Sequence, residues 1–179
     1  ANYSVAVGGY ALATENTSGG TVAVGYQALE DQDVSSPNNV AVGYQAGLNL
    51  SSGTNSVYVG YKAGGVGTIT GNDNVVVGRQ AAEDATAMNQ SVIIGSGASK
   101  AGVNAAAGNV VIGYNAGNDL TSGGSNILIG SSAGANVDTG NNNVAIGDNA
   151  FGSSDSAELY NIAIGTNALG TESSGADGC

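Results

Sequence analysis

Tyrosines and carboxylates are the residues of this sequence whose spacing could support chemistry. Tyr26, Tyr44 and Tyr61 recur at intervals of 18 and 17 residues, and Tyr114 holds the same place in a later segment. Such a row of rings can bind sugars, or the rings can stack on one another and end on a cation, here Arg79. We expect the structural stack and keep carbohydrate binding as the alternative.

Asp138 and Asp155 stand eight residues after corresponding glycines of two consecutive segments. Two neighbouring carboxylates can bind Ca²⁺ or can cleave a glycosidic bond. The glycine-rich calcium motif GGxGxD is absent from the sequence. The two aspartates also fall in predicted turns of a regular rod, where no cleft is expected. We therefore expect neither catalysis nor a metal, and no cofactor.

The composition excludes most other chemistry. The sequence has no His and a single Cys, which rules out a His-based catalytic triad and zinc sites built from His or Cys clusters. Three cations against fourteen carboxylates give a net charge of −11, so a nucleic-acid partner is not expected. No apolar run approaches the ~20 residues of a membrane span, so no membrane insertion is expected. Cys179 is a candidate for an intermolecular disulfide.

A repeat of 17 or 18 residues positions these side chains, and NNVAVGYQAG at 38–47 is one copy of its centre. Each copy has a central glycine and an alanine three residues later. Val or Ile stands three residues and one residue before the glycine, a period of two that is typical of a β-strand. The rest of each copy is rich in Gly, Ser, Thr, Asn and Asp, which predicts turns. The ten central glycines are Gly8, Gly25, Gly43, Gly60, Gly78, Gly95, Gly113, Gly130, Gly147 and Gly165.

One repeat of this size cannot bury its own apolar face, whereas stacked repeats bury a continuous core. The sequence therefore predicts an all-β fold, a parallel β-solenoid of ten coils over residues 1–170. At a strand spacing of ~4.8 Å, the rod would be about 48 Å long. Residues 171–179 are expected to form a short polar tail.

We call the residues at one position of successive repeats a column, and the polar column lies four residues before the glycine. Its members are Asn, Ser or Thr in every repeat. We expect them to form an internal ladder of hydrogen bonds from coil to coil, as in other stacked β-structures. The asparagines of this column are Asn39, Asn74, Asn109, Asn126, Asn143 and Asn161.

The middle column, two residues before the glycine, is apolar in all ten repeats. Side chains alternate between the two faces of a strand. We expect the Val and Ile on either side, the flanking columns, to point into the coil, and the middle column to point outward. An outward apolar column predicts a self-association face. Its members are Ala41, Tyr58, Val76, Ile93, Val111, Leu128 and Ala145.

The segments NILIG (126–130), NVAIG (143–147) and NIAIG (161–165), each followed by x-x-A, resemble the repeat of YadA-like trimeric autotransporter adhesin heads. Similar arrays look like segments of phage tail-fibre proteins. The resemblance covers about residues 2–170. It implies a left-handed parallel β-roll, a homotrimer with the middle column facing the three-fold axis, and adhesion to host surfaces. The coils here are a few residues longer than those of the family, and no neck, coiled-coil stalk or membrane anchor is apparent.

We therefore expect a non-catalytic, extracellular structural and adhesive protein at a cell or virion surface. Its partners would be copies of itself, most simply as a trimer, and a host-surface or polysaccharide receptor. Because no polar cap is apparent at either end, we also expect coil ten of one copy to stack on coil one of the next, giving a fibre. The alternative is a carbohydrate-binding or carbohydrate-cleaving segment of a phage tailspike.

Overall fold

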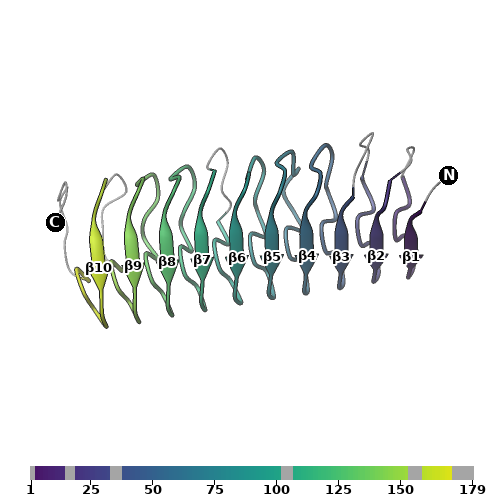
Figure 1. Cartoon of the computed structure of the whole chain (residues 1–179). Helices are drawn as coiled ribbons and strands as arrows, with labels where there is room; N and C mark the ends of the chain where they lie inside the picture. Colours follow the sequence, from purple (N-terminus) through teal and green to yellow (C-terminus); the bar gives the residue numbers. More distant parts are fainter. Residues whose placement is uncertain (1–2, 15–18, 33–37, 102–106, 153–158, 171–179) are drawn as a thin grey trace.

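The part of the chain that the structure describes contains ten parallel strands of three residues each, one strand from each repeat. The computed structural model describes residues 3–14, 19–32, 38–101, 107–152 and 159–170. Each strand pairs with the next one along the chain, and the order of strands in the sheet is their order in the sequence. The strands therefore lie side by side in a row, with β1 and β10 at opposite ends (Figure 1). The strands are β1 (Val5–Val7), β2 (Val22–Val24), β3 (Val40–Val42), β4 (Val57–Val59), β5 (Val75–Val77), β6 (Val92–Ile94), β7 (Val110–Ile112), β8 (Ile127–Ile129), β9 (Val144–Ile146) and β10 (Ile162–Ile164).

The register places equivalent residues of successive repeats beside one another, so the columns of the sequence are columns in space. Ala6 lies beside Ala23, and Ala41 lies beside Tyr58. This arrangement is a parallel β-solenoid, and the predicted fold class is confirmed to that extent. The predicted tail, 171–179, lies outside the described residues.

Every strand ends at a central glycine because the chain must turn there against the next repeat. Gly25 has φ +137°, a conformation that residues with a side chain rarely adopt. A β-carbon on Gly25 would also lie 2.3 Å from the carbonyl oxygen of Gly43. In the turn after Gly43, the N–H of Ala46 donates to the carbonyl of Gly43 at 3.4 Å, and Ala46 is fully buried. The invariant glycine and alanine thus make one tight corner.

The assignment of the two strand faces from the sequence was wrong. The middle column lies inside the coil: all seven residues predicted to form a self-association face have no exposed surface in the single chain. The flanking Val and Ile residues point outward instead, and several are more than one-third exposed. The residues that were predicted to point outward and that lie inside the coil are Ala41, Tyr58, Val76, Ile93, Val111, Leu128 and Ala145.

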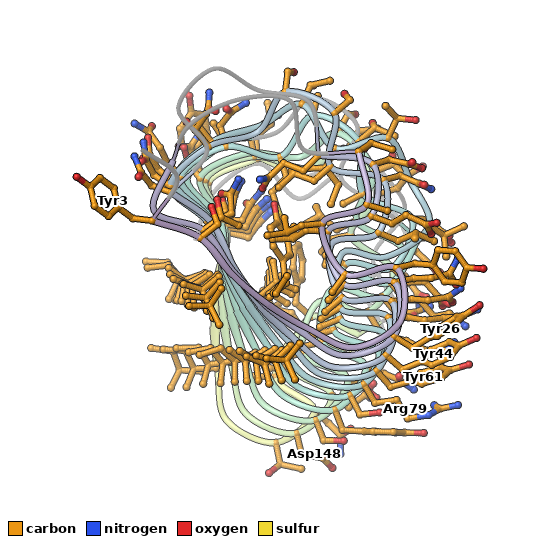
Figure 2. The ribbon with its side chains drawn as sticks, turned by 90° about the vertical axis from the view of Figure 1, so that its right-hand side faces the viewer. Tyr3, Tyr26, Tyr44, Tyr61, Arg79 and Asp148 are labelled. Atoms are coloured by element: carbon orange, nitrogen blue, oxygen red, sulfur yellow. The ribbon has the colours of Figure 1, made fainter. Side chains whose placement is uncertain are left out.

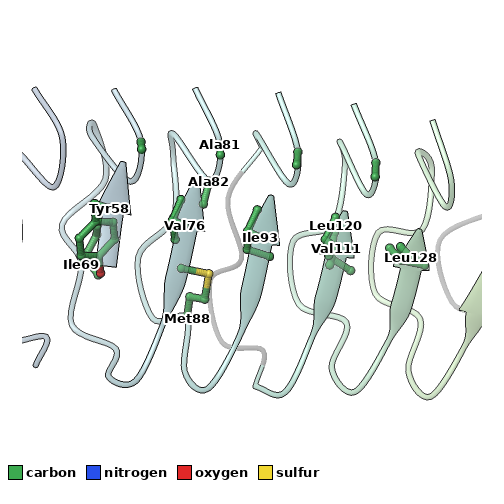
Figure 3. Close-up of a cluster of buried hydrophobic side chains, with 14 of the residues drawn as sticks. Tyr58, Ile69, Val76, Ala81, Ala82, Met88, Ile93, Val111, Leu120 and Leu128 are labelled. Carbon is green, nitrogen blue, oxygen red and sulfur yellow. The ribbon is translucent and has the colours of Figure 1, made fainter. Parts of the chain in front are cut away.

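The physical reason for this orientation is the narrow interior, which the middle column fills together with a second column and with buried residues of the turns such as Ile69, Met88 and Leu120 (Figure 3). The second column stands four residues after the glycine, and we call it the partner column. Where the middle residue is Ala23 or Ala145, the partner residue is Leu29 or Phe151. Where the middle residue is Tyr58, Val111 or Leu128, the partner residue is glycine. One large and one small side chain therefore share each of these levels, and all the large ones are buried.

Candidate functional site

The most extensive candidate site is the outer apolar face, which the flanking columns form along all ten strands. The contrast within one strand is sharp: Ile127 is 39% exposed, whereas its neighbour Leu128 is fully buried. Val75 and Val76 of β5 differ in the same way, at 36% and 0%. Rows of side chains made only of carbon run along the outside of the ribbon (Figure 2). The outer apolar face comprises Val5, Val7, Val22, Val24, Val40, Val42, Val57, Val59, Val75, Val77, Val92, Ile94, Val110, Ile112, Ile127, Ile129, Val144, Ile146, Ile162 and Ile164.

The electrostatics of this face differ from those of the whole chain. The net charge of the chain is −11, yet no residue of the ten described strands is charged. The carboxylates stand in the connecting segments. Two copies can therefore bring these faces together without placing carboxylates in the contact.

The tyrosine row is a stack of rings. The Tyr26 and Tyr44 ring centroids are 5.4 Å apart with an interplanar angle of 16°, and Tyr44 and Tyr61 are 5.4 Å apart at 11°. Tyr10 packs edge-on against the far side of Tyr26, with centroids 5.8 Å apart. The Arg79 guanidinium carbon lies 5.9 Å from the Tyr61 centroid. These side chains project from one corner of the coil (Figure 2).

This geometry leaves little of each ring face for a sugar. Both faces of Tyr44 are covered by its neighbours, and the outer faces of Tyr26 and Tyr61 meet Tyr10 and Arg79. What remains open is the edge that carries the hydroxyl group. The arrangement therefore suits a stack that supports the corner better than a platform for sugar rings.

Tyr114 does not belong to this stack. It stands in the same column between Ser96 and Ser131, with which its turn is connected by backbone hydrogen bonds of 3.0 and 2.8 Å. Its ring is well exposed. Its place in the repeat predicted that Tyr114 belongs with the other three tyrosines, and the structure separates it from them.

The three cations of the chain, Lys62, Arg79 and Lys100, lie in three consecutive repeats. The Nζ atoms of Lys62 and Lys100 are 3.8 and 3.7 Å from the Glu83 carboxylate. Gln80 donates a 2.7 Å hydrogen bond to the same carboxylate. Glu83 is nearly buried, so these contacts compensate a desolvated charge. Lys62 and Lys100 thus neutralise Glu83, whereas Arg79 lies over the ring of Tyr61.

The polar column forms an internal ladder. The side-chain oxygen of Asn39 accepts the backbone N–H of Ser56 at 2.8 Å, and Asn126 accepts that of Asn143 at 2.9 Å. The Asn126 amide also donates to the carbonyl of Gly140 at 2.8 Å. All six asparagines of the column are buried. The hydrogen bonds of these side chains therefore connect successive repeats.

No acidic site for a metal is found among the residues the structure describes, which contain no group of three or more His, Cys, Asp or Glu side chains. Asp138 accepts a hydrogen bond from the hydroxyl of Thr121. Its proposed companion Asp155 lies outside the described residues, and so does Cys179. Within the same part of the chain, no helix is long and apolar enough to cross a membrane.

Comparisons with known proteins found no relative of this chain. No family model, no curated protein and no solved structure matches the chain. The class of the protein is therefore the one its fold defines, an all-β repeat protein with the form of a parallel β-solenoid.

Proposed function

We propose that this protein is a non-catalytic structural and adhesive rod that associates with copies of itself through the outer apolar face. The observation that carries the proposal is the partial exposure of Val and Ile on the outer side of the strands. Such a continuous apolar stripe requires a partner surface, and a second copy offers an identical stripe of the same length.

The size of the face supports this proposal. Two aliphatic columns along about 48 Å of rod present on the order of 500 Å² of apolar surface, a size typical of interaction sites. At roughly 25 cal/mol per Å², burying it stabilises an assembly by on the order of 10 kcal/mol per copy before the cost of association. Because the cost of association is of similar size, the assembly is stable only when the outer apolar face is buried over its whole length.

We infer a homotrimer built on a left-handed β-roll, as the resemblance to adhesin heads implies. In this arrangement the flanking columns face the three-fold axis, and the middle column fills each coil. The acidic, polar turns then cover the outside of the trimer, where a host-surface or polysaccharide receptor would bind. An extracellular location at a cell or virion surface fits this role.

Two matched substitutions test the proposal. Ile127→Asp together with Val75→Asp places two carboxylates on the outer apolar face, where a monomer leaves them hydrated. The double variant should lose lateral association, so that its mass per unit length falls to that of one rod, and it should keep the thermal unfolding of a rod without lateral partners. The control Leu128→Asp buries a charge inside the coil and should unfold the protein. If the double variant keeps the mass per unit length of the native assembly, the outer apolar face is not the interface.

A further inference from the structure

The polar column ends on an acceptor that lacks a donor. In the preceding repeats, the side-chain oxygen of each asparagine accepts a backbone N–H of the following repeat, as Asn143 does from Asn161 at 2.9 Å. Asn161 is fully buried, and its own side-chain oxygen has no hydrogen-bond partner in the described structure. An unpaired buried acceptor is unfavourable. The position of this oxygen at the end of the ladder points to a donor from one further repeat.

The backbone of β10 presents the groups that pair with such a repeat. Between β9 and β10, the N–H of Val144 donates to the carbonyl of Asn161 at 2.8 Å, and the N–H of Gly165 donates to the carbonyl of Ile146 at 2.7 Å. The equivalent groups one repeat later are the N–H of Ile162 and the carbonyl of Ile164. A β-carbon on Gly165 would have no atom within 4 Å, so the space beyond this glycine is open. The edge can receive a strand in the register used throughout the sheet.

The opposite end of the rod offers a repeat of the required kind. Strand β1 has the sequence VAV, the same as β2 and β3, and its flanking residues Val5 and Val7 are exposed. It pairs with β2 on one side only, in the register common to all strands. A repeat that stacks on β10 therefore finds the same backbone pattern that β1 presents to β2.

Two tyrosines mark the two ends. Tyr3 and Tyr160 both stand five residues before their central glycines, and the eight repeats between them have Gly, Asn, Asp, Gln or Ser at this position. The two rings are 80% and 64% exposed. Tyr160 has φ +62°, which is unusual for an aromatic residue. If β1 of one copy stacked on β10 of another, Tyr3 would lie beside Tyr160 at the repeat spacing, as Tyr26 lies beside Tyr44.

We propose that the β10 edge of one copy binds the β1 edge of a second copy in the register of the solenoid, so that the rod continues from molecule to molecule. This contact supplies the donor for Asn161 and the companion ring for Tyr160. It lengthens the assembly along its axis, whereas the outer apolar face thickens it. The two proposals therefore fail separately: length measures the end contact, and mass per unit length measures the lateral one.

Charges at the two tyrosines test the end contact with little risk to the fold, because both rings are exposed and Asp73 already occupies the same column with φ +59°. The native chain should form rods whose length, measured by electron microscopy, exceeds about 48 Å and grows with concentration. Tyr3→Asp with Tyr160→Asp places like charges in contact, and the rods should shorten to single-molecule length. Tyr3→Asp with Tyr160→Lys pairs opposite charges and should restore the long rods.

Two results would overturn the proposal. One is a native chain that stays at single-molecule length at every concentration. The other is equal rod length for the like-charged and the oppositely charged double variants. Circular dichroism of both variants verifies that the solenoid is intact, so a change in length reports on the ends alone.

Discussion

The ring of Tyr58 occupies the space that a side chain at Gly64 would need. A β-carbon on Gly64 would lie 2.6 Å from two ring carbons of Tyr58, and Tyr58 is fully buried. Two repeats earlier, the equivalent pair is Ala23 and Leu29, with the large side chain on the other side of the interior. The coil therefore tolerates the large side chain on either side of the interior.

Exchanging this pair tests the packing rule. Tyr58→Ala alone should cost about 3–5 kcal/mol through the cavity it leaves, and Gly64→Leu alone about 1–3 kcal/mol through overpacking. The double variant recreates the Ala23–Leu29 pair and should recover at least half of the summed loss. Leu29 has φ +50° and Gly64 has φ +55°, so a leucine can adopt the backbone conformation found there. Urea unfolding measures all three variants, and strictly additive losses would contradict the rule.

The hydroxyl of Tyr58 gives stability a dependence on alkaline pH. Burial raises the pKa of Tyr58 from 10.0 to about 12, and the nearby Ser56 hydroxyl offsets only part of this effect. The folded state thus holds the proton more tightly than the unfolded state. The raised pKa therefore leaves the free energy of unfolding unchanged below pH 10. The free energy of unfolding falls as the pH rises from 10 through 12, because the unfolded state then loses this proton more readily than the folded state. Unfolding free energies measured between pH 8 and 12 should fall over that window.

Tyr58→Phe is the control for this titration. The hydroxyl has no hydrogen-bond partner of ordinary geometry in the described structure. Its removal should stabilise the protein at pH 8 by about 1 kcal/mol, because an unsatisfied buried group is lost. The alkaline decline should also become shallower in the variant. If the native chain and the Tyr58→Phe variant decline identically, groups other than this hydroxyl cause the effect.

The polar ladder predicts a graded response at Asn126. Asn126→Ala leaves the N–H of Asn143 and the carbonyl of Gly140 without their present partner and should cost about 2–4 kcal/mol. Asn126→Ser should cost less, because the Ser56 and Ser91 hydroxyls already accept the N–H of the next repeat at 3.0 and 3.2 Å. Thermal unfolding of the two variants gives the comparison. Equal losses would mean that the ladder contributes through volume alone.

The tyrosine stack should contribute to stability, not to sugar binding. Tyr44→Ala removes two stacked contacts, each of which is worth about 0.5–1.5 kcal/mol beyond its buried area. Tyr114→Ala, at an unstacked position of the same column, is the matched control and should change stability little. Titration of the native chain with neutral oligosaccharides should show no shift of tyrosine fluorescence. A saturable shift that Tyr44→Ala abolishes would favour the carbohydrate-binding alternative.

Much of the fold follows from the spacing of residues. The central glycines and the two-residue period of Val and Ile predicted parallel strands stacked one repeat apart, and the structure confirms this. The repeats predicted a solenoid because a single repeat buries too little apolar surface to fold alone, whereas stacked repeats bury a continuous core. The stacking of Tyr26 on Tyr44 could also be predicted, since the register of a solenoid places equivalent residues side by side.

The orientation of the strands could not be read from apolar character, because both faces are apolar and a period of two then gives no contrast. The informative signal was the variation in size. The middle column ranges from Ala23 to Tyr58, and the large residues stand opposite small partners while Ala23 stands opposite a large one, as Leu29 and Gly64 illustrate. The flanking columns are Val or Ile throughout and need no such compensation. Side chains that must share a closed space vary together, whereas those on an open face do not.

The mass of the assembly tests the central claim most directly. The like-charged variant Tyr3→Asp with Tyr160→Asp blocks growth from the ends, so that its mass reports only on the outer apolar face. Sedimentation equilibrium should give about 52 kDa, three times the 17.2 kDa of one chain. A mass near 17 kDa at all concentrations would contradict the account, because the Val and Ile columns would then remain in water without a partner.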